Sequence, residues 1–91
     1  MLVLVSYDIE DDKIRIRLAK KLLDFGPRVQ LSVFEADVTE KELKKLKQAL
    51  QKIKLADDDS IRLYRLCEIC TKKITIWGKG VVTKDKDYYI S

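Results

Sequence analysis

The chain opens with a short apolar run, residues 2–5, that leads into Tyr7-Asp8-Ile9. A run of this length, rich in valine and leucine and followed by acidic residues, predicts a buried β-strand. Apolar positions then recur at helical spacing over residues 14–25, and Asp11 or Asp12 is placed to cap that helix. A Gly-Pro pair follows it, which predicts the end of the helix.

The middle of the chain predicts more extended structure and a second helix. Residues 28–35 alternate as an extended chain does, and residues 36–38 could continue them after a bend. They therefore form one long strand or two short ones. Residues 39–42 make a capping box, a specific signal for the start of a helix. Leucines at helical spacing follow, and they supply the apolar stripe of that helix.

The last third predicts strands at residues 61–66 and 74–78, and a short strand at residues 88–90. In chain order the elements match an α+β ferredoxin-like sandwich, with two helices on one face of an antiparallel sheet. We therefore expect a ferredoxin-like domain over residues 1–78. Residues 79–91 are then a linker and a C-terminal strand that docks on a partner chain.

The first strand also predicts that the molecule is a homodimer. Two helices can cover only one face of the sheet, yet this strand is apolar on both faces, with Leu2 and Leu4 on one and Val3 and Val5 on the other. A second copy of the chain is the simplest cover for the remaining face. A two-fold axis there would bring equivalent strand ends together.

Composition narrows the function. The chain has 91 residues, a formal net charge of +4 and 37% charged residues of both signs, which favours an acidic partner only weakly. No apolar run approaches the roughly 20 residues of a membrane span, and no secretory signal is recognisable, so we expect a cytoplasmic protein. The sequence has no histidine. Hydrolysis would therefore depend on carboxylates, a metal ion, or both.

Asp8 is the first candidate for chemistry, because it lies where the buried strand ends. One interpretation is a turn-forming or helix-capping aspartate. The other is a hard oxygen ligand for Mg²⁺ or Mn²⁺, with water, phosphate oxygens and the Asp8 of a second chain completing the site. A metal held in this way could activate water and stabilise charge on a phosphodiester.

Three arginines and two aromatic residues are candidates for contacts with a nucleic acid. Arg15, Arg17 and Arg28 carry planar guanidinium groups that suit phosphate oxygens. Tyr7 and Phe34 could stack on bases or simply pack in the core. The sequence alone leaves both interpretations open.

Cys67 and Cys70 have CxxC spacing. A turn with reduced thiols, a local disulfide, and a zinc ion shared between chains are the three alternatives. Since the pair falls between two predicted strands and not at a predicted helix start, the sequence argues against a thioredoxin-like role.

Several motifs taken together resemble one known family. Tyr7-Asp8-Ile9, the basic first helix with Arg15 and Arg17, Arg28-Val29-Gln30 and Ser32-Val33-Phe34-Glu35 resemble the small CRISPR-associated endonuclease family that partners the CRISPR integrase. The resemblance runs from Met1 to about Trp77. It includes the turn around Cys67 and Cys70, which is similar to a common variant in that family.

The resemblance implies a ferredoxin-like homodimer whose C-terminal strand, here Tyr88-Tyr89-Ile90, is swapped to the partner chain. It implies a metal-dependent endonuclease that hydrolyses phosphodiester bonds of single-stranded RNA or double-stranded DNA. Asp8 matches the metal-binding aspartate, which pairs with its symmetry mate. The other matching positions are tied to activity or to substrate handling: Tyr7, Arg15, Arg17, Arg28 and Phe34.

The resemblance also implies a role in antiviral defence through spacer acquisition. The dimer would bridge integrase dimers and hold the new DNA segment. A non-catalytic adaptor of this kind is the main alternative to the nuclease. A generic RNA-binding domain is a third, but the chain lacks the aromatic-rich strand motif with which RRM domains stack on bases.

Overall fold

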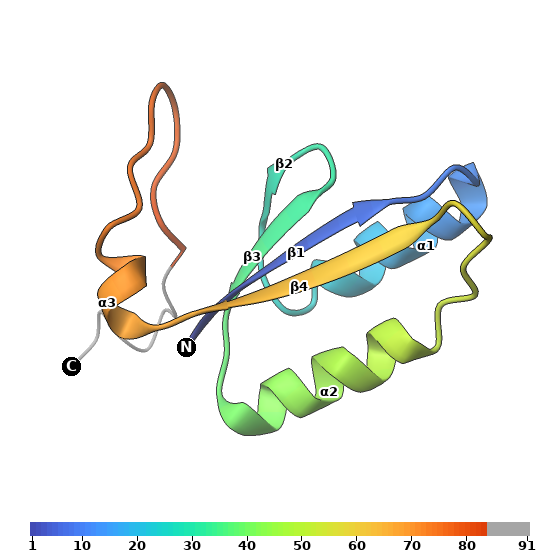
Figure 1. The fold of residues 1–91 in the computed structure, drawn as a ribbon, viewed down its shortest axis with the longest axis horizontal. Coiled ribbons are helices and arrows are strands. Elements are labelled where there is room, and N and C mark those ends of the chain that lie inside the picture. The colour runs from blue at the N-terminus through green and yellow to red at the C-terminus, as the bar shows by residue number, and fades with distance from the viewer. Residues whose placement is uncertain (84–91) are drawn as a thin grey trace.

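The structure is a computed structural model that describes residues 1–83. Its elements are β1 (Leu2–Asp8), α1 (Asp12–Leu22), β2 (Arg28–Gln30), β3 (Val33–Asp37), α2 (Glu40–Gln51), β4 (Ser60–Leu66) and α3 (Glu68–Thr71). The strands form one four-stranded sheet in the order β2-β3-β1-β4 with antiparallel pairing throughout (Figure 1). This order and the two long helices confirm the predicted α+β ferredoxin-like arrangement. Among these residues no helix is long and apolar enough to cross a membrane.

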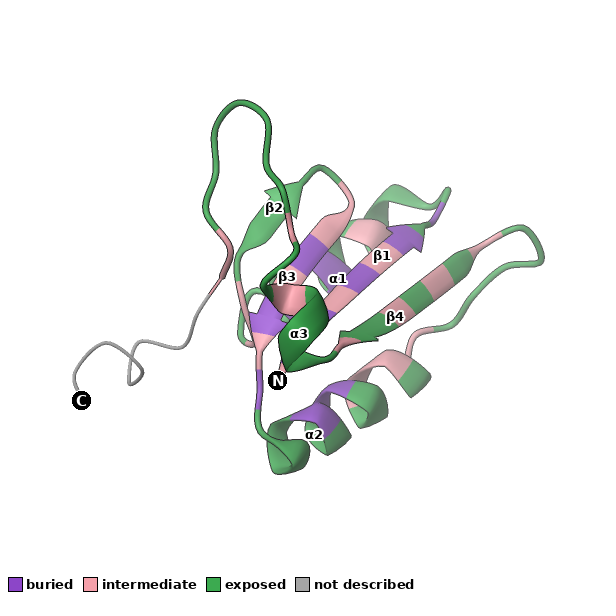
Figure 2. Cartoon of the chain, turned by 60° about the vertical axis from the view of Figure 1, so that its left-hand side comes forward, coloured by how far each residue is buried: buried purple, intermediate pink, exposed green. Residues whose placement is uncertain are grey.

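Strand β1 lies between β3 and β4, and from Val3 onward its side chains alternate between two environments, whereas Leu2 is buried as well. Val3, Val5 and Tyr7 are buried against the helices, with Val3 fully inaccessible. Leu4 and Ser6 are half-buried and Asp8 is exposed, because they point to the other face. Figure 2 shows this alternation as bands along β1. We call the face with Leu4, Ser6 and Asp8 the open face of the sheet.

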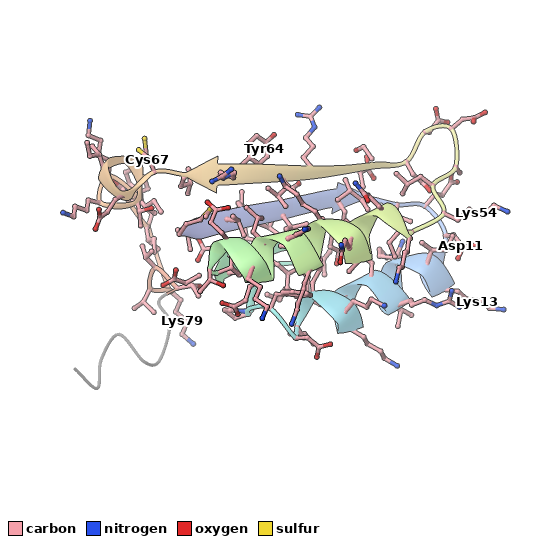
Figure 3. All side chains as sticks on the ribbon, turned by 90° about the horizontal axis from the view of Figure 1, so that it is seen from below. Asp11, Lys13, Lys54, Tyr64, Cys67 and Lys79 are labelled. Atoms are coloured by element: carbon pink, nitrogen blue, oxygen red, sulfur yellow. The ribbon has the colours of Figure 1, made fainter. Side chains whose placement is uncertain are left out.

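Both helices pack on the opposite side, as Figure 3 shows with α1 and α2 below the strands. Helix α1 begins after Asp11, whose side chain accepts a hydrogen bond from the N–H of Ile14 at 3.1 Å. Helix α2 begins with the predicted capping box. The Thr39 hydroxyl accepts from the N–H of Glu42 at 3.2 Å, and the Glu42 carboxylate accepts from the N–H of Thr39 at 3.0 Å. The predicted caps of both helices are therefore confirmed.

The two helices bury the apolar stripes that their spacing predicts. Helix α1 contributes Leu18, Ala19 and Leu22 to the core, and α2 contributes Leu43 and Leu46. Burial of each leucine side chain stabilises the folded chain by about 2 kcal/mol. The core between sheet and helices is thus continuous, and it fixes β1 in place.

The alternating segment from residue 28 to residue 38 forms two short strands, so the interpretation as one long strand is wrong. Leu31 and Ser32 make the turn between β2 and β3, and Leu31 is 82% exposed. The pairing also shifts register between Arg28 and Gln30. The shift and the turn break the simple alternation, and Phe34 consequently faces the core.

The C-terminal part of the described chain differs from the sequence prediction. Residues 74–77 form no strand, and the short helix α3 follows Cys67 directly. The N–H groups of Lys73 and Ile74 donate to the carbonyls of Cys70 and Thr71, so the chain continues as a turn instead of pairing with β4. The predicted strand at residues 88–90, and its swap to a partner, lie outside the described residues.

Gly26 allows the chain to pass close to the sheet after α1. A Cβ atom added there would overlap the carbonyl oxygen of Glu35 and would lie 2.8 Å from the Cα of Ala36. Both are backbone atoms of β3 and cannot move aside independently. Glycine is therefore required here for a close approach of two backbone segments.

We expect Gly26→Ala to lower the free energy of unfolding by about 2–3 kcal/mol, since β3 or the loop after α1 must shift. Urea denaturation measures the change. Lys20→Ala, on the exposed side of α1, is the control and should stay within about 0.5 kcal/mol of wild type. Equal effects of the two substitutions would show that the close approach does not constrain the fold.

Candidate functional site

The carboxylate of Asp8 stands at the end of β1 on the open face, and it is exposed. In the part of the chain that the structure describes, this carboxylate accepts no hydrogen bond and forms no ion pair. The cap of α1 is Asp11 and not Asp8. The structure therefore does not support the capping interpretation of Asp8, and it leaves the carboxylate available to a ligand.

Two nearby aspartates, Asp59 and Asp12, have structural roles that Asp8 lacks. The Asp59 carboxylate accepts hydrogen bonds from the N–H of Glu10 at 3.1 Å and the N–H of Ala56 at 3.0 Å. It thereby ties the turn before β4 to the turn after β1. Asp12 forms an ion pair with Arg15 one turn further along α1. These contacts hold the turn that follows Asp8 and the turn before β4.

Strand β4 adds residues to the open face beside Asp8. Ser60 is paired with Asp8, and Arg62 is paired with Ser6, so both side chains point to the same side as Asp8. Arg62 donates a hydrogen bond to the Tyr64 hydroxyl at 3.3 Å, and this bond raises the pKa of the guanidinium above its ordinary value. The Tyr64 side chain projects above β4 in Figure 3, away from the helices.

Ser60, Arg62 and Tyr64 were missed by the sequence reasoning, which treated β4 only as a strand. The sequence could nevertheless have predicted that these three side chains share one face of the sheet. In the predicted antiparallel sheet, alternate residues of β4 lie opposite alternate residues of β1. What the sequence lacked was the register that sets Ser60 against Asp8.

Arg15 and Arg17 lie on α1 and differ in what they contact. The Arg15 guanidinium donates to the carbonyl of Ile9 at 3.0 Å and to that of Glu10 at 3.3 Å. Arg15 thus holds the connection that follows Asp8. Arg17 is exposed, and within residues 1–83 it makes no such contact. Its donors are therefore free for a phosphate.

Tyr7 and Phe34 lie in the core, on the helix side of the sheet. Their exposed fractions are 5% and 2%, and their rings stack with centroids 6.2 Å apart. Arg28 lies over Phe34, with its guanidinium carbon 5.5 Å from the ring centre. The prediction that Phe34 contacts a nucleic acid is not supported, since its ring is covered by protein. Tyr7 points away from Asp8, so a direct catalytic role beside that carboxylate is not supported either.

The donor set near Asp8 suits a hard divalent cation as one half of a site. Mg²⁺ accepts one or two protein carboxylates and completes its shell with water and phosphate oxygens. In residues 1–83, no group of three or more His, Cys, Asp and Glu could hold a metal. At Asp8 the remaining ligands of such an ion would be water, phosphate oxygens or a carboxylate of another chain.

Comparison with known proteins finds relatives that all belong to one family. The family model described as CRISPR associated protein Cas2 matches residues 1–74. The chain is 41% identical over 90 residues to "CRISPR-associated endoribonuclease Cas2 3" of Chloroflexus aurantiacus, covering 99% of this chain and 97% of that protein. It is 39% identical over 88 residues to "CRISPR-associated endoribonuclease Cas2" of Mycobacterium tuberculosis H37Rv, covering 97% and 75%.

Solved structures show the same fold. The crystal structure of Streptococcus pyogenes Cas2 matches with a TM-score of 0.72 and 37% identity, covering 86% of this chain and all of that chain. A chain from a structure titled "Partial Cas6-RT-Cas1--Cas2 complex" matches with a TM-score of 0.70 and 30% identity, covering 82% and 88%. The likeness extends over sheet and helices together.

We expect Arg15→Ala to lower the free energy of unfolding by about 1 kcal/mol, because two carbonyls and Asp12 lose their donor while water replaces part of the loss. Arg17→Ala removes the same charge from the same helix without breaking such contacts, and should stay within about 0.5 kcal/mol. Urea denaturation of both variants tests the difference. Equal destabilisation would mean that Arg15 has no role in holding the connection after Asp8.

Proposed function

The chain belongs to the family described as CRISPR associated protein Cas2, and on this premise we propose that it is a metal-dependent endonuclease whose central residue is Asp8. The observation that carries the proposal is an exposed carboxylate, at the end of the central strand, that has no structural partner within residues 1–83. Single-stranded RNA is the first substrate to test, because relatives carry the name endoribonuclease. Double-stranded DNA is the second.

We propose that two chains complete the site by facing each other across their open faces. The support is that both helices cover the other side, while Leu4 is half-buried and Tyr64 remains 44% exposed on the open one. A homodimer through this face would cover these side chains and would bring two Asp8 carboxylates toward one axis. The C-terminal strand predicted at residues 88–90 belongs to the same proposal.

In this proposal each residue of the site has a separate role. Asp8 holds Mg²⁺ or Mn²⁺, which when bound would supply charge stabilisation and lower the pKa of a water molecule. Arg17, exposed on α1 outside the proposed dimer contact, contacts phosphates of the nucleic acid. Arg62 lies on the open face between Asp8 and Tyr64, so in the dimer it would face the partner chain near the paired carboxylates. Arg15 keeps the connection after Asp8 in position through its contacts with Ile9 and Glu10. Tyr7 supports the position of Asp8 indirectly, by packing on Phe34 on the helix side of β1.

A second candidate function is a non-catalytic adaptor in spacer acquisition, in which the dimer bridges CRISPR integrase dimers and holds spacer DNA. The observation that favours it is the match to a chain in a structure whose title pairs Cas1 with Cas2. The two functions need different surfaces, so one protein can perform both.

We expect Asp8→Asn to lower the cleavage rate by at least about a hundredfold, because the amide cannot replace a metal-binding carboxylate. The assay uses single-stranded RNA and double-stranded DNA with Mg²⁺, Mn²⁺ or EDTA. Asp24→Asn, an exposed aspartate just after α1, is the control and should cleave as wild type does. Cleavage by Asp8→Asn at the wild-type rate would refute the nuclease site, and unimpaired spacer integration by the same variant would separate the adaptor function from it.

We expect Tyr7→Phe to retain cleavage within about threefold of wild type, since the hydroxyl lies on the far side of the sheet from Asp8 and contributes no chemistry there. Tyr7→Ala should instead lower the free energy of unfolding by about 3 kcal/mol, through the cavity that it opens beside Phe34. Cleavage and thermal unfolding are measured on both variants. A hundredfold loss of cleavage in Tyr7→Phe, with unchanged unfolding, would assign the hydroxyl a direct role.

A further inference from the structure

Cys67 and Cys70 lie at the opposite end of the β1–β4 pair from Asp8. Leu66, the residue before Cys67, is paired with Leu2, whereas Asp8 is paired with Ser60. The two pairs are six positions apart along the strand, which corresponds to about 20 Å. Figure 3 likewise places Cys67 and Asp11 at opposite ends of the molecule. The cysteines are therefore remote from the site described above.

The structure places the two cysteines on a single helical turn. Cys67 caps α3, and its sulfur accepts a hydrogen bond from the N–H of Cys70 at 3.3 Å. The Cys67 carbonyl accepts from the N–H of Thr71 at 2.9 Å and from its hydroxyl at 3.0 Å, which closes the turn. The expectation that the pair does not lie at a helix start is thus wrong, and the argument against redox chemistry is removed.

The geometry of this turn allows a disulfide. Residues three apart in a helical turn have Cα atoms about 5 Å apart, inside the range that disulfides span. Both side chains are exposed thiols, so oxidation needs no unfolding of the core. Cys67 also lines a cavity of 620 Å³ together with Leu2, Arg65 and Lys72. A cavity of that size admits a small peptide thiol.

The two sulfurs differ in their hydrogen bonding, since only the Cys67 sulfur accepts a backbone N–H within the turn. The N–H of Cys70 that donates to the Cys67 sulfur lowers the pKa of the Cys67 thiol, which favours its thiolate. The neighbouring Cys67 sulfur, through its hydrogen bond and its charge, raises the pKa of the Cys70 thiol. Cys67 is therefore the thiol of the pair that attacks first, and Cys70 is the thiol that attacks second.

We propose that Cys67 and Cys70 form a reversible dithiol–disulfide site whose oxidising substrate is a low-molecular-weight disulfide of the glutathione type. The Cys67 thiolate attacks one sulfur of that disulfide, breaks its S–S bond, and releases one small thiolate, which takes up a proton. Cys70 then loses its proton and attacks the Cys67 sulfur. The mixed disulfide breaks, the second small thiol leaves, and the Cys67–Cys70 bond remains.

The disulfide would fix the turn from which the chain returns to the sheet. After α3 the described chain comes back to β3, where the Thr83 hydroxyl donates to the Glu35 carboxylate at 2.9 Å. Glu35 is paired with Leu4 and so belongs to the open face. Oxidation at Cys67 therefore constrains the start of a segment whose far end contacts that face.

The test equilibrates the whole protein with mixtures of reduced and oxidised glutathione, followed by acid quenching, alkylation and mass spectrometry. We expect a single transition in which the wild-type chain loses two hydrogens and no mixed disulfide accumulates. Cys70→Ser should accumulate a mixed disulfide at Cys67. Serine is a good helix cap, so Cys67→Ser should keep α3, and its Cys70 should react about threefold more slowly than Cys67 does in Cys70→Ser.

Two results would overturn the proposal. One is a wild-type protein that forms no internal disulfide at any glutathione ratio, with both cysteines reacting at the same rate in the single variants. The other is a purified protein whose thiols are protected by a stoichiometric zinc ion until a chelator removes it. Neither result depends on cleavage of a nucleic acid, so the outcome is independent of the function assigned to Asp8.

Discussion

Strand β1 is paired on both edges, with β3 and with β4, so each of its side chains can point only toward the helices or away from them. Val3, Val5 and Tyr7 point toward the helices and form the floor of the core. Asp8 must then point to the open face. A shift of β1 by one residue would bury that carboxylate and expose the valines, at a cost of several kcal/mol. The burial of one half of the strand thus places the candidate site on the other half.

The same constraint explains which parts of the site could be predicted from the sequence. Asp8 was predictable, because a carboxylate at the end of a short apolar run is a local signal. The partners of Tyr7 and Phe34 were not. Both residues belong to motifs that also contain exposed positions, and only the register of β1 against β3 shows that their rings meet in the core. Motif neighbours such as Tyr7 and Asp8 are adjacent along the chain and separated by the sheet.

The fold was predictable where local chemistry specifies it and less so elsewhere. The capping box at Thr39 fixes the start of α2 through contacts within four residues. The segment from Ile74 to Trp77 has the composition of a strand, but strand propensity requires a neighbouring strand to act. Within residues 1–83 the turn after α3 directs that segment away from β4. The four-residue helix α3 is too short to give a periodic pattern of apolar residues. Its capping residue, Cys67, was noted in the sequence only for its CxxC spacing.

We propose that Asp8 is half of a site that two chains complete, and mixed dimers of wild-type and Asp8→Asn chains test this proposal. Wild-type and Asp8→Asn chains are unfolded, mixed in equal amounts and refolded, and the cleavage rate per total protein is compared with that of wild type. If two Asp8 carboxylates share one site, only dimers with two wild-type chains cleave, and the rate falls to about a quarter. A rate of about one half would contradict the claim, since each chain would then carry a site of its own.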